Sequence, residues 1–200
     1  MQEPWFAPLV WMDYKLAVLF NVLLPLILLI WAFVQKNEAM QRLLIIYWRV
    51  ASLLAIAVYL MIAAIPIGFI TGAIARILIP ISLWFWRDIN EEINDLPARP
   101  LKLALTSWRW AITVYSSLGI LAQIPFLKCG FSSKESILNN PFCRVWLDAP
   151  WSYKEIIHPH IGNQGFLGFL GIVGLIAYVL SLGYFVFFKL VKEGRSAMEH

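Results

Sequence analysis

The sequence predicts an all-α protein, a polytopic membrane bundle of about five transmembrane helices with one long extracytoplasmic loop. Three observations predict this fold. The 200 residues are 60% hydrophobic, their mean hydropathy is +0.72, and 14% of them are charged. The charged residues lie in the gaps between apolar stretches of roughly 20 residues, the length that a helix needs to cross a hydrocarbon core. A soluble domain of this composition would expose large apolar patches to water, so this class is excluded.

The predicted spans form a single integral membrane domain over residues 1–200. In chain order they cover residues 16–34, 43–65, 67–86, 103–127 and 166–188, with the outer loop over residues 128–165. The first span has no basic segment before it and no small-residue cleavage site after it, so we expect it to be retained. Pro66 and Gly68 mark the turn between the second and third spans.

An odd number of spans places the two termini on opposite sides of the membrane, and the basic residues predict which side is cytoplasmic. The side of the C-terminus holds Lys36, Arg42, Arg49, Arg87, Arg99, Lys102, Arg109, Lys189, Lys192 and Arg195. The other side holds Lys15, Lys128, Lys134, Arg144 and Lys154. The positive-inside rule therefore predicts an N-terminus outside, in the lumen or periplasm, and a cytoplasmic C-terminus.

Tryptophans near the span ends agree with this orientation, because indole rings favour the headgroup level. The cytoplasmic ends hold Trp31, Trp48, Trp84, Trp86, Trp108 and Trp110, and the outer side holds Trp5, Trp11, Trp146 and Trp151. Three arginines beside the inner indoles, Arg49, Arg87 and Arg109, are expected to anchor the bundle at the phosphates or to pair with nearby carboxylates.

Arg76 differs from these anchoring residues. It precedes Arg87 by eleven residues, about 16 Å along a helix, which places it near the middle of the bilayer. A charge there costs about 2.5 kcal/mol or more and is normally turned toward protein or water. The predicted spans contain no Asp, Glu or His, so Asn21, Thr71, Gln123 or backbone carbonyls are the partners within the chain. Either Arg76 holds helices together, or it contacts a partner subunit, an anionic ligand or a lipid headgroup.

Two sets of glycines predict close helix packing. Gly68 and Gly72 form a G-x-x-x-G pair on the helix face that also carries Arg76. Around the start of the fifth span, every third residue from 165 to 174 is a glycine. Each step of three residues turns about 60° around the helix axis, so the row winds half around the helix. Its members are Gly165, Gly168, Gly171 and Gly174. We therefore expect the fifth helix to touch neighbours on more than one side, whether helices of its own chain, another subunit or a flat cofactor tail.

Cys129 and Cys143 lie in the predicted outer loop, where an oxidising compartment favours a disulfide over two separate thiols. A metal site is not expected, because these cysteines with His158 and His160 do not follow the usual ligand spacings. The predicted spans contain no histidine to ligate a haem, so this chain alone is expected to bind no cofactor. Lipid or pigment contact within a complex stays open. Scattered basic residues argue against nucleic-acid binding.

No catalytic motif is found. The segment from Thr71 to Arg76 resembles part of the CDP-alcohol phosphotransferase signature, but Thr71, Ile89 and Ile93 stand where that family has metal-binding aspartates. Without these carboxylates the metals have no ligands. We therefore expect that the protein is not an enzyme.

Nearly the whole chain resembles a family of uncharacterised multi-spanning membrane proteins from cyanobacteria, a domain of unknown function. Four strings carry this resemblance: LVWMDY at 9–14, RLLIIYWR at 42–49, ISLWFW at 81–86 together with NEE at 90–92, and PFCRVW at 141–146. The resemblance implies a photosynthetic host, and hence a thylakoid or plasma membrane. It provides no active-site residues.

These observations predict a non-enzymatic accessory or assembly subunit of a larger thylakoid complex, photosynthetic or respiratory, with membrane lipids and other membrane subunits as partners. The alternative is a small carrier or channel for an anion or a lipid headgroup, with Arg76 as the binding charge. Carriers commonly contain inverted repeats and broken helices, and the sequence offers little of either beyond Pro80.

Overall fold

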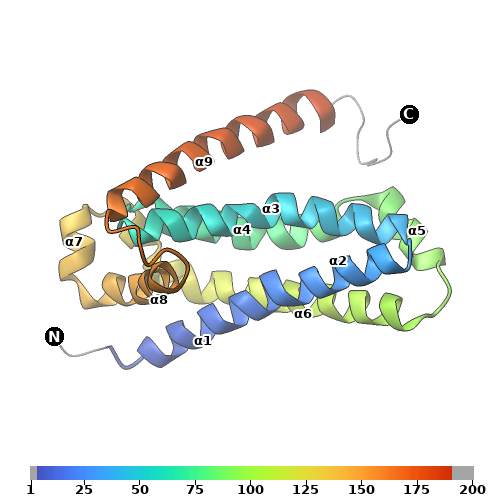
Figure 1. Cartoon of the computed structure of the whole chain (residues 1–200), viewed down its shortest axis with the longest axis horizontal. Helices are drawn as coiled ribbons and strands as arrows, with labels where there is room; N and C mark the ends of the chain where they lie inside the picture. The colour runs from blue at the N-terminus through green and yellow to red at the C-terminus, as the bar shows by residue number, and fades with distance from the viewer. Residues whose placement is uncertain (1–3, 191–200) are drawn as a thin grey trace.

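The computed structural model describes residues 4–190 as a bundle of helices (Figure 1). Within this part of the chain, five helical stretches are long and apolar enough to cross a membrane. They cover Ala7–Val34, Glu38–Ile62, Ile67–Trp84, Pro100–Phe131 and Gln164–Phe188. The all-α fold with about five candidate spans is confirmed. The largest difference from the predicted boundaries is in the first helix, which begins at Ala7 instead of Leu16.

Several of these stretches combine more than one helical element. The first comprises α1 (Ala7–Val18), the π-helical turn η1 (Leu19–Leu23) and α2 (Leu24–Val34), and it is followed by α3 (Glu38–Ile62), α4 (Ile67–Trp84) and the short α5 (Arg87–Asp95). Next, α6 (Pro100–Gln123) continues into the 3-10 helix η2 (Ile124–Phe131). The remaining elements are α7 (Lys134–Asn139), α8 (Pro141–Ile157), α9 (Gln164–Tyr184) and the π-helical η3 (Phe185–Leu190).

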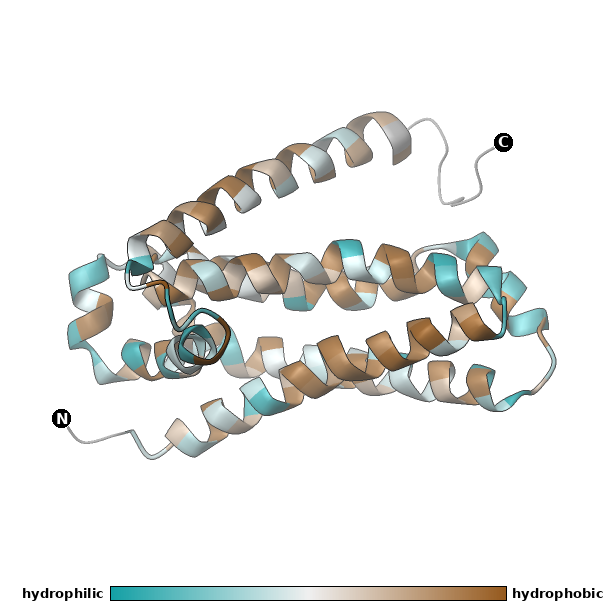
Figure 2. Ribbon diagram, in the orientation of Figure 1, coloured by the Kyte–Doolittle hydropathy of each residue, from teal (hydrophilic) through white to brown (hydrophobic). Residues whose placement is uncertain are grey.

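The bundle has two polar ends. We call one the disulfide end, which holds η2, α7 and α8, and the other the α5 end, which holds α5 and the α2–α3 turn (Figure 1). Hydrophilic residues gather at both ends, whereas hydrophobic residues cover the lengths of the helices between them (Figure 2). This distribution is the one expected for helices that cross a bilayer.

Helix termini are set by local sequence. Asn37 caps α3 by accepting a hydrogen bond from the backbone N–H of Met40 at 3.0 Å, a standard N-cap arrangement. The α3–α4 turn lies at Ala63 and Ala64, where Ala64 adopts φ 53°. The turn therefore covers residues 63–66 and includes Pro66 as predicted, whereas Gly68 lies inside α4 and not in the turn.

Residues 128–165 were predicted to form one long loop, and this part of the prediction is wrong. Most of the segment is helical, in η2, α7 and α8. Cys129 of η2 and Cys143 of α8 form a disulfide, with their Cα atoms 5.8 Å apart, and both side chains are buried. The segment is thus a helical cap on one end of the bundle.

Prolines inside helices free backbone carbonyls, because a proline has no N–H to donate to the residue four positions earlier. Pro25 frees the carbonyl of Asn21, which accepts a hydrogen bond from the Tyr47 hydroxyl at 2.9 Å. Pro150 of α8 likewise frees the carbonyl of Trp146, which accepts a hydrogen bond from the Tyr14 hydroxyl at 3.0 Å. Phenols from neighbouring helices, that of the buried Tyr47 and that of the half-buried Tyr14, therefore donate to the freed carbonyls and join the helices around them.

Some predicted headgroup anchors lie in the core instead. Trp86, Trp108 and Trp146 are buried, and the Trp108 indole N–H donates to the carbonyl of Phe20 at 2.9 Å. The anchoring prediction for these tryptophans is wrong because their rings are packed inside the bundle and do not face the headgroup layer.

Arg109, also predicted to be a membrane anchor, is 3% exposed. Its guanidinium donates to the carbonyl of Leu83 at 2.7 Å and to Asn90 Oδ1 at 2.6 Å, and it lies 4.0 Å from the centre of the Trp84 ring. Arg109 therefore joins α6 to the end of α4 and to α5. Arg87 does remain at the surface, where it pairs with Glu91 at 2.8 Å.

Candidate functional site

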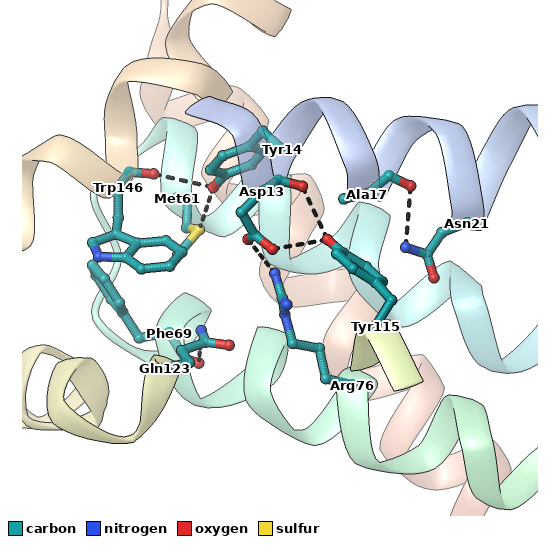
Figure 3. A network of polar contacts seen from close by, with 10 residues as sticks. All are labelled: Asp13, Tyr14, Ala17, Asn21, Met61, Phe69, Arg76, Tyr115, Gln123 and Trp146. Atoms are coloured by element: carbon teal, nitrogen blue, oxygen red, sulfur yellow. Dashed lines mark hydrogen bonds and ion pairs between the residues drawn. The ribbon is translucent and has the colours of Figure 1, made fainter. Parts of the chain in front are cut away.

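The most polar part of the membrane-spanning region is the Arg76 cluster, which we define as Asp13, Arg76, Tyr115 and Gly119 together with Tyr14 (Figure 3). Arg76 lies near the middle of α4, and its Nη2 donates to Asp13 Oδ2 of α1. The side chains of Arg76 and Asp13 are 11% and 20% exposed. The guanidinium and the carboxylate therefore neutralise each other in the bundle interior.

Tyr115 of α6 completes the ion pair. Its hydroxyl lies 2.9 Å from both the backbone oxygen and Oδ1 of Asp13, and its ring centre is 5.4 Å from the Arg76 guanidinium carbon (Figure 3). The phenol thus donates to the carboxylate while the ring faces the cation, an arrangement that favours the charged form of both partners. Three helices contribute one group each, so the cluster fixes how α1, α4 and α6 meet.

Gly119 provides the space for the guanidinium. A Cβ at this position would collide with Nη1 and Cζ of Arg76. Because Gly119 lies one turn after Tyr115 on α6, the same helix face supplies both the phenol and the opening. Packing thus requires a residue without a side chain here.

Tyr14 connects the cluster to the helical cap. Its hydroxyl lies 3.4 Å from Met61 Sδ and donates to the carbonyl of Trp146, so α1, α3 and α8 meet at one phenol (Figure 3). Within the described residues, Arg76 Nη1 and Gln123 Oε1 are buried without a hydrogen-bond partner. Arg76 Nη1 is therefore the polar atom of the cluster that is left without a hydrogen bond to any described residue, and Gln123 Oε1 is a second such atom outside the cluster.

The partners predicted for Arg76 bond elsewhere. Thr71 donates to the carbonyl of Ile67 at 2.9 Å, Asn21 donates to that of Ala17 at 3.1 Å, and Gln123 donates to that of Phe69 at 3.4 Å. The expectation that no span carries a carboxylate is wrong, because α1 extends back past Asp13. Whether Arg76 also contacts a ligand or a partner subunit stays a prediction.

Most of the predicted packing glycines belong to α4 and α9 and face α3. A Cβ on Gly68 would lie 3.0 Å from Met61 Cγ, and one on Gly72 would lie 3.8 Å from the Ala57 Cβ and 3.7 Å from Gln123 Nε2. This close approach joins α4 to α3.

The glycines of α9 differ from the prediction in direction. Gly168 faces Ala63, directly after the end of α3, and Gly171 and Gly174 face Leu60 and Ile56 of α3, instead of winding around α9. Gly165 has a different role, since the nearest atoms to a Cβ there belong to its own cap residue, Asn163. The small residues thus mark one antiparallel seam between α9 and α3.

His158 also has a partner in the chain. Its Nε2 lies 2.7 Å from the Tyr59 hydroxyl at the end of α3, and its ring packs edge-on against both Tyr59 and Tyr153. Burial and the neighbouring Tyr59 raise the pKa of Tyr153. Across the described residues, no group of three His, Cys, Asp or Glu residues is placed to hold a metal ion.

Neither a curated protein nor a solved structure matches this chain. Residues 7–198, which include every side chain of the Arg76 cluster and both cysteines, match one protein family, described as a protein of unknown function (DUF3177). The chain belongs to the DUF3177 family.

Proposed function

We propose that this protein is a non-enzymatic accessory or assembly subunit of a larger membrane complex, in a thylakoid membrane and of photosynthetic or respiratory type. The observation that carries the proposal is the contrast around α9. One side of α9 packs on α3 through glycines, whereas Phe169, Ile176 and Leu180 on other sides are exposed. A helix attached to its bundle along one seam offers the rest of its surface to other membrane helices.

The non-enzymatic assignment rests on how the polar groups are used. Asp13 is bound to a guanidinium and a phenol, and the Tyr47 hydroxyl is bound to a freed backbone carbonyl. These groups stabilise helix contacts, and none of them is paired as a nucleophile with a general base. The carrier alternative has less support from the structure than from the sequence, since Asp13 already neutralises Arg76.

We also propose that the disulfide end faces the lumen or periplasm and the α5 end faces the cytoplasm. Arg42 and Arg87 at the α5 end support this orientation, as do Lys192 and Arg195, which lie outside the described residues. A membrane-impermeant maleimide added to sealed thylakoid vesicles whose cytoplasmic face is outward should label Glu92→Cys on α5 and should not label Ser133→Cys at the disulfide end. The reverse labelling would overturn this orientation.

Purification in mild detergent tests the subunit proposal. A tagged chain from its native membranes should migrate as a complex larger than the 23.0 kDa of the chain. Replacing Phe169 and Leu180 of α9 by alanine should release the chain from that complex. The matched control replaces Leu118 and Leu121, which are exposed on α6, and should leave the complex intact. A single small species in every gentle detergent contradicts the proposal.

A further inference from the structure

A lateral crevice opens where α9 diverges from the bundle toward the α5 end (Figure 1). It has a volume of about 680 Å³ and lies between α3, α4 and α9 with η3. Most of its lining is aliphatic or aromatic, including Ile56, Leu78, Phe85 and Leu182. The volume falls within the range of pockets that hold small ligands in proteins.

One cation lies in this apolar lining. Arg49 of α3 is exposed on the crevice wall, and it is the twelfth residue of the 25 in its helix, about 16 Å along the helix from Glu38. Its guanidinium makes no ion pair or hydrogen bond with any residue that the structure describes. An arginine inside a membrane span normally finds a partner, because an isolated charge there is costly.

The facing helix, α9, contributes hydroxyl groups to the crevice that Arg49 lines. Tyr178 and Ser181 of α9 line the same crevice, and their hydroxyls form no hydrogen bond within residues 4–190. By contrast, Ser52 and Ser82 on the opposite walls donate to carbonyls of their own helices. Among the residues that the structure describes, the crevice lining therefore offers one cation and two available hydroxyls in an otherwise apolar space.

The direction of the side chain favours a ligand that enters from the α5 end. Side chains of a helix tilt toward its N-terminus, and α3 begins at the α5 end. The Arg49 guanidinium is thereby directed toward the headgroup layer on that side, which is also the side where α9 lies farther from α3 (Figure 1).

We infer that this crevice binds an anionic membrane lipid, whose phosphate pairs with Arg49 and whose acyl chain lies along the apolar walls. The phosphate would accept hydrogen bonds from the guanidinium and from the hydroxyls of Tyr178 and Ser181. Phe85 and Leu182 would contact the acyl chain. This inference goes beyond the accessory-subunit proposal, and it is testable on the purified chain alone.

Native mass spectrometry tests it. The full chain is reconstituted in nanodiscs of equal parts phosphatidylglycerol and phosphatidylcholine, transferred to detergent, and the retained lipids are counted. Wild type should retain one phosphatidylglycerol in preference to phosphatidylcholine. Arg49→Leu should reduce that preference about tenfold, the effect expected for a lost charge-assisted hydrogen bond. Arg49→Lys should keep most of it.

Two further variants separate the site from the general charge of the protein. Arg42→Leu is the matched control, since Arg42 lies two turns earlier on α3 and already pairs with Glu38 at 3.4 Å, and it should retain the lipid like wild type. Ser181→Trp, which fills the crevice without changing its charge, should lose it. Size-exclusion profiles matching that of wild type show that each variant is folded.

Three outcomes overturn the inference. The first is equal retention of the two lipids by wild type. The second is an equal loss for Arg42→Leu and Arg49→Leu, which would assign the preference to net charge. The third is a dimer in place of a lipid adduct, if formation of the dimer depends on Arg49. A second copy of the chain would then occupy the crevice.

Discussion

Arg76 and Arg49 occupy similar positions in their helices but opposite surroundings. Each lies near the middle of an apolar helix. Arg76 is enclosed by Asp13 and Tyr115, whereas Arg49 lines an open crevice with no ion pair among the described residues. The comparison teaches that the helix position of a membrane arginine does not determine its role. The groups brought to it by other helices do.

The largest effect should come from separating Asp13 and Arg76. Asp13→Leu leaves a buried guanidinium without its carboxylate and should lower the free energy of unfolding by about 3–5 kcal/mol. The double variant Asp13→Leu with Arg76→Met should recover most of this loss, because no buried charge is left. Both values can be measured by denaturation in mixed micelles, followed by near-ultraviolet circular dichroism.

The control for this pair is Arg87→Met. Arg87 and Glu91 form an exposed pair on one helix, and its loss should cost less than about 1 kcal/mol. Equal losses for Asp13→Leu and Arg87→Met would show that the Arg76 cluster is not the enclosed site described above.

The next effect concerns the disulfide, which joins η2 to α8 at the disulfide end of the bundle. The crevice opens toward the opposite end. Replacing both Cys129 and Cys143 by serine should lower the free energy of unfolding by about 3 kcal/mol, since the crosslink restricts the unfolded chain. Lipid retention at Arg49 should be unchanged. A reducing agent should destabilise wild type by a similar amount and leave the double variant unaffected. Any further loss of stability in that variant would show that the effect of the reducing agent does not come from the Cys129–Cys143 disulfide.

A smaller effect should follow from filling the space beside Arg76. Gly119→Ala places a methyl group against the guanidinium and should cost about 1–3 kcal/mol, as overpacking does. Its control is Gly183→Ala, because no atom lies within 4 Å of a Cβ at Gly183. In an Arg76→Ala background the Gly119→Ala cost should vanish, which a double-mutant cycle on unfolding free energies can measure. A cost that persists there would place the collision elsewhere.

Sequence patterns predicted the membrane helices well because each span is a local property. Apolar length alone sets Glu38–Ile62 and Ile67–Trp84 to within a few residues of the predicted boundaries. The first span was predicted too short because a hydropathy pattern excludes a charged residue such as Asp13 from a span. That exclusion removed the carboxylate that neutralises Arg76.

The rest of the cluster could not be predicted from local patterns. Tyr115 and Gly119 lie 102 and 106 residues after Asp13, and no spacing rule links positions so far apart. One signal was available. Tyr115 and Gly119 are four residues apart and share a helix face, so a hydroxyl group lies beside a position where the missing side chain leaves room for another residue. The sequence likewise could not separate Arg109, which is buried, from Arg49, which is exposed, since each directly follows a tryptophan.

The smallest effect on the isolated chain is expected at the other arginine, and it is the sharpest test of the comparison. In lipid-free detergent, Arg49→Leu should change the free energy of unfolding by no more than about 0.5 kcal/mol, because no described residue loses a partner. Phosphatidylglycerol added at one hundred times the wild-type dissociation constant should then stabilise wild type by about 2.7 kcal/mol, and the variant, which binds about tenfold more weakly, by only about 1.4 kcal/mol. If Arg49→Leu instead destabilises the lipid-free chain as strongly as Asp13→Leu does, both arginines are structural, and the distinction between an enclosed charge and an open one fails.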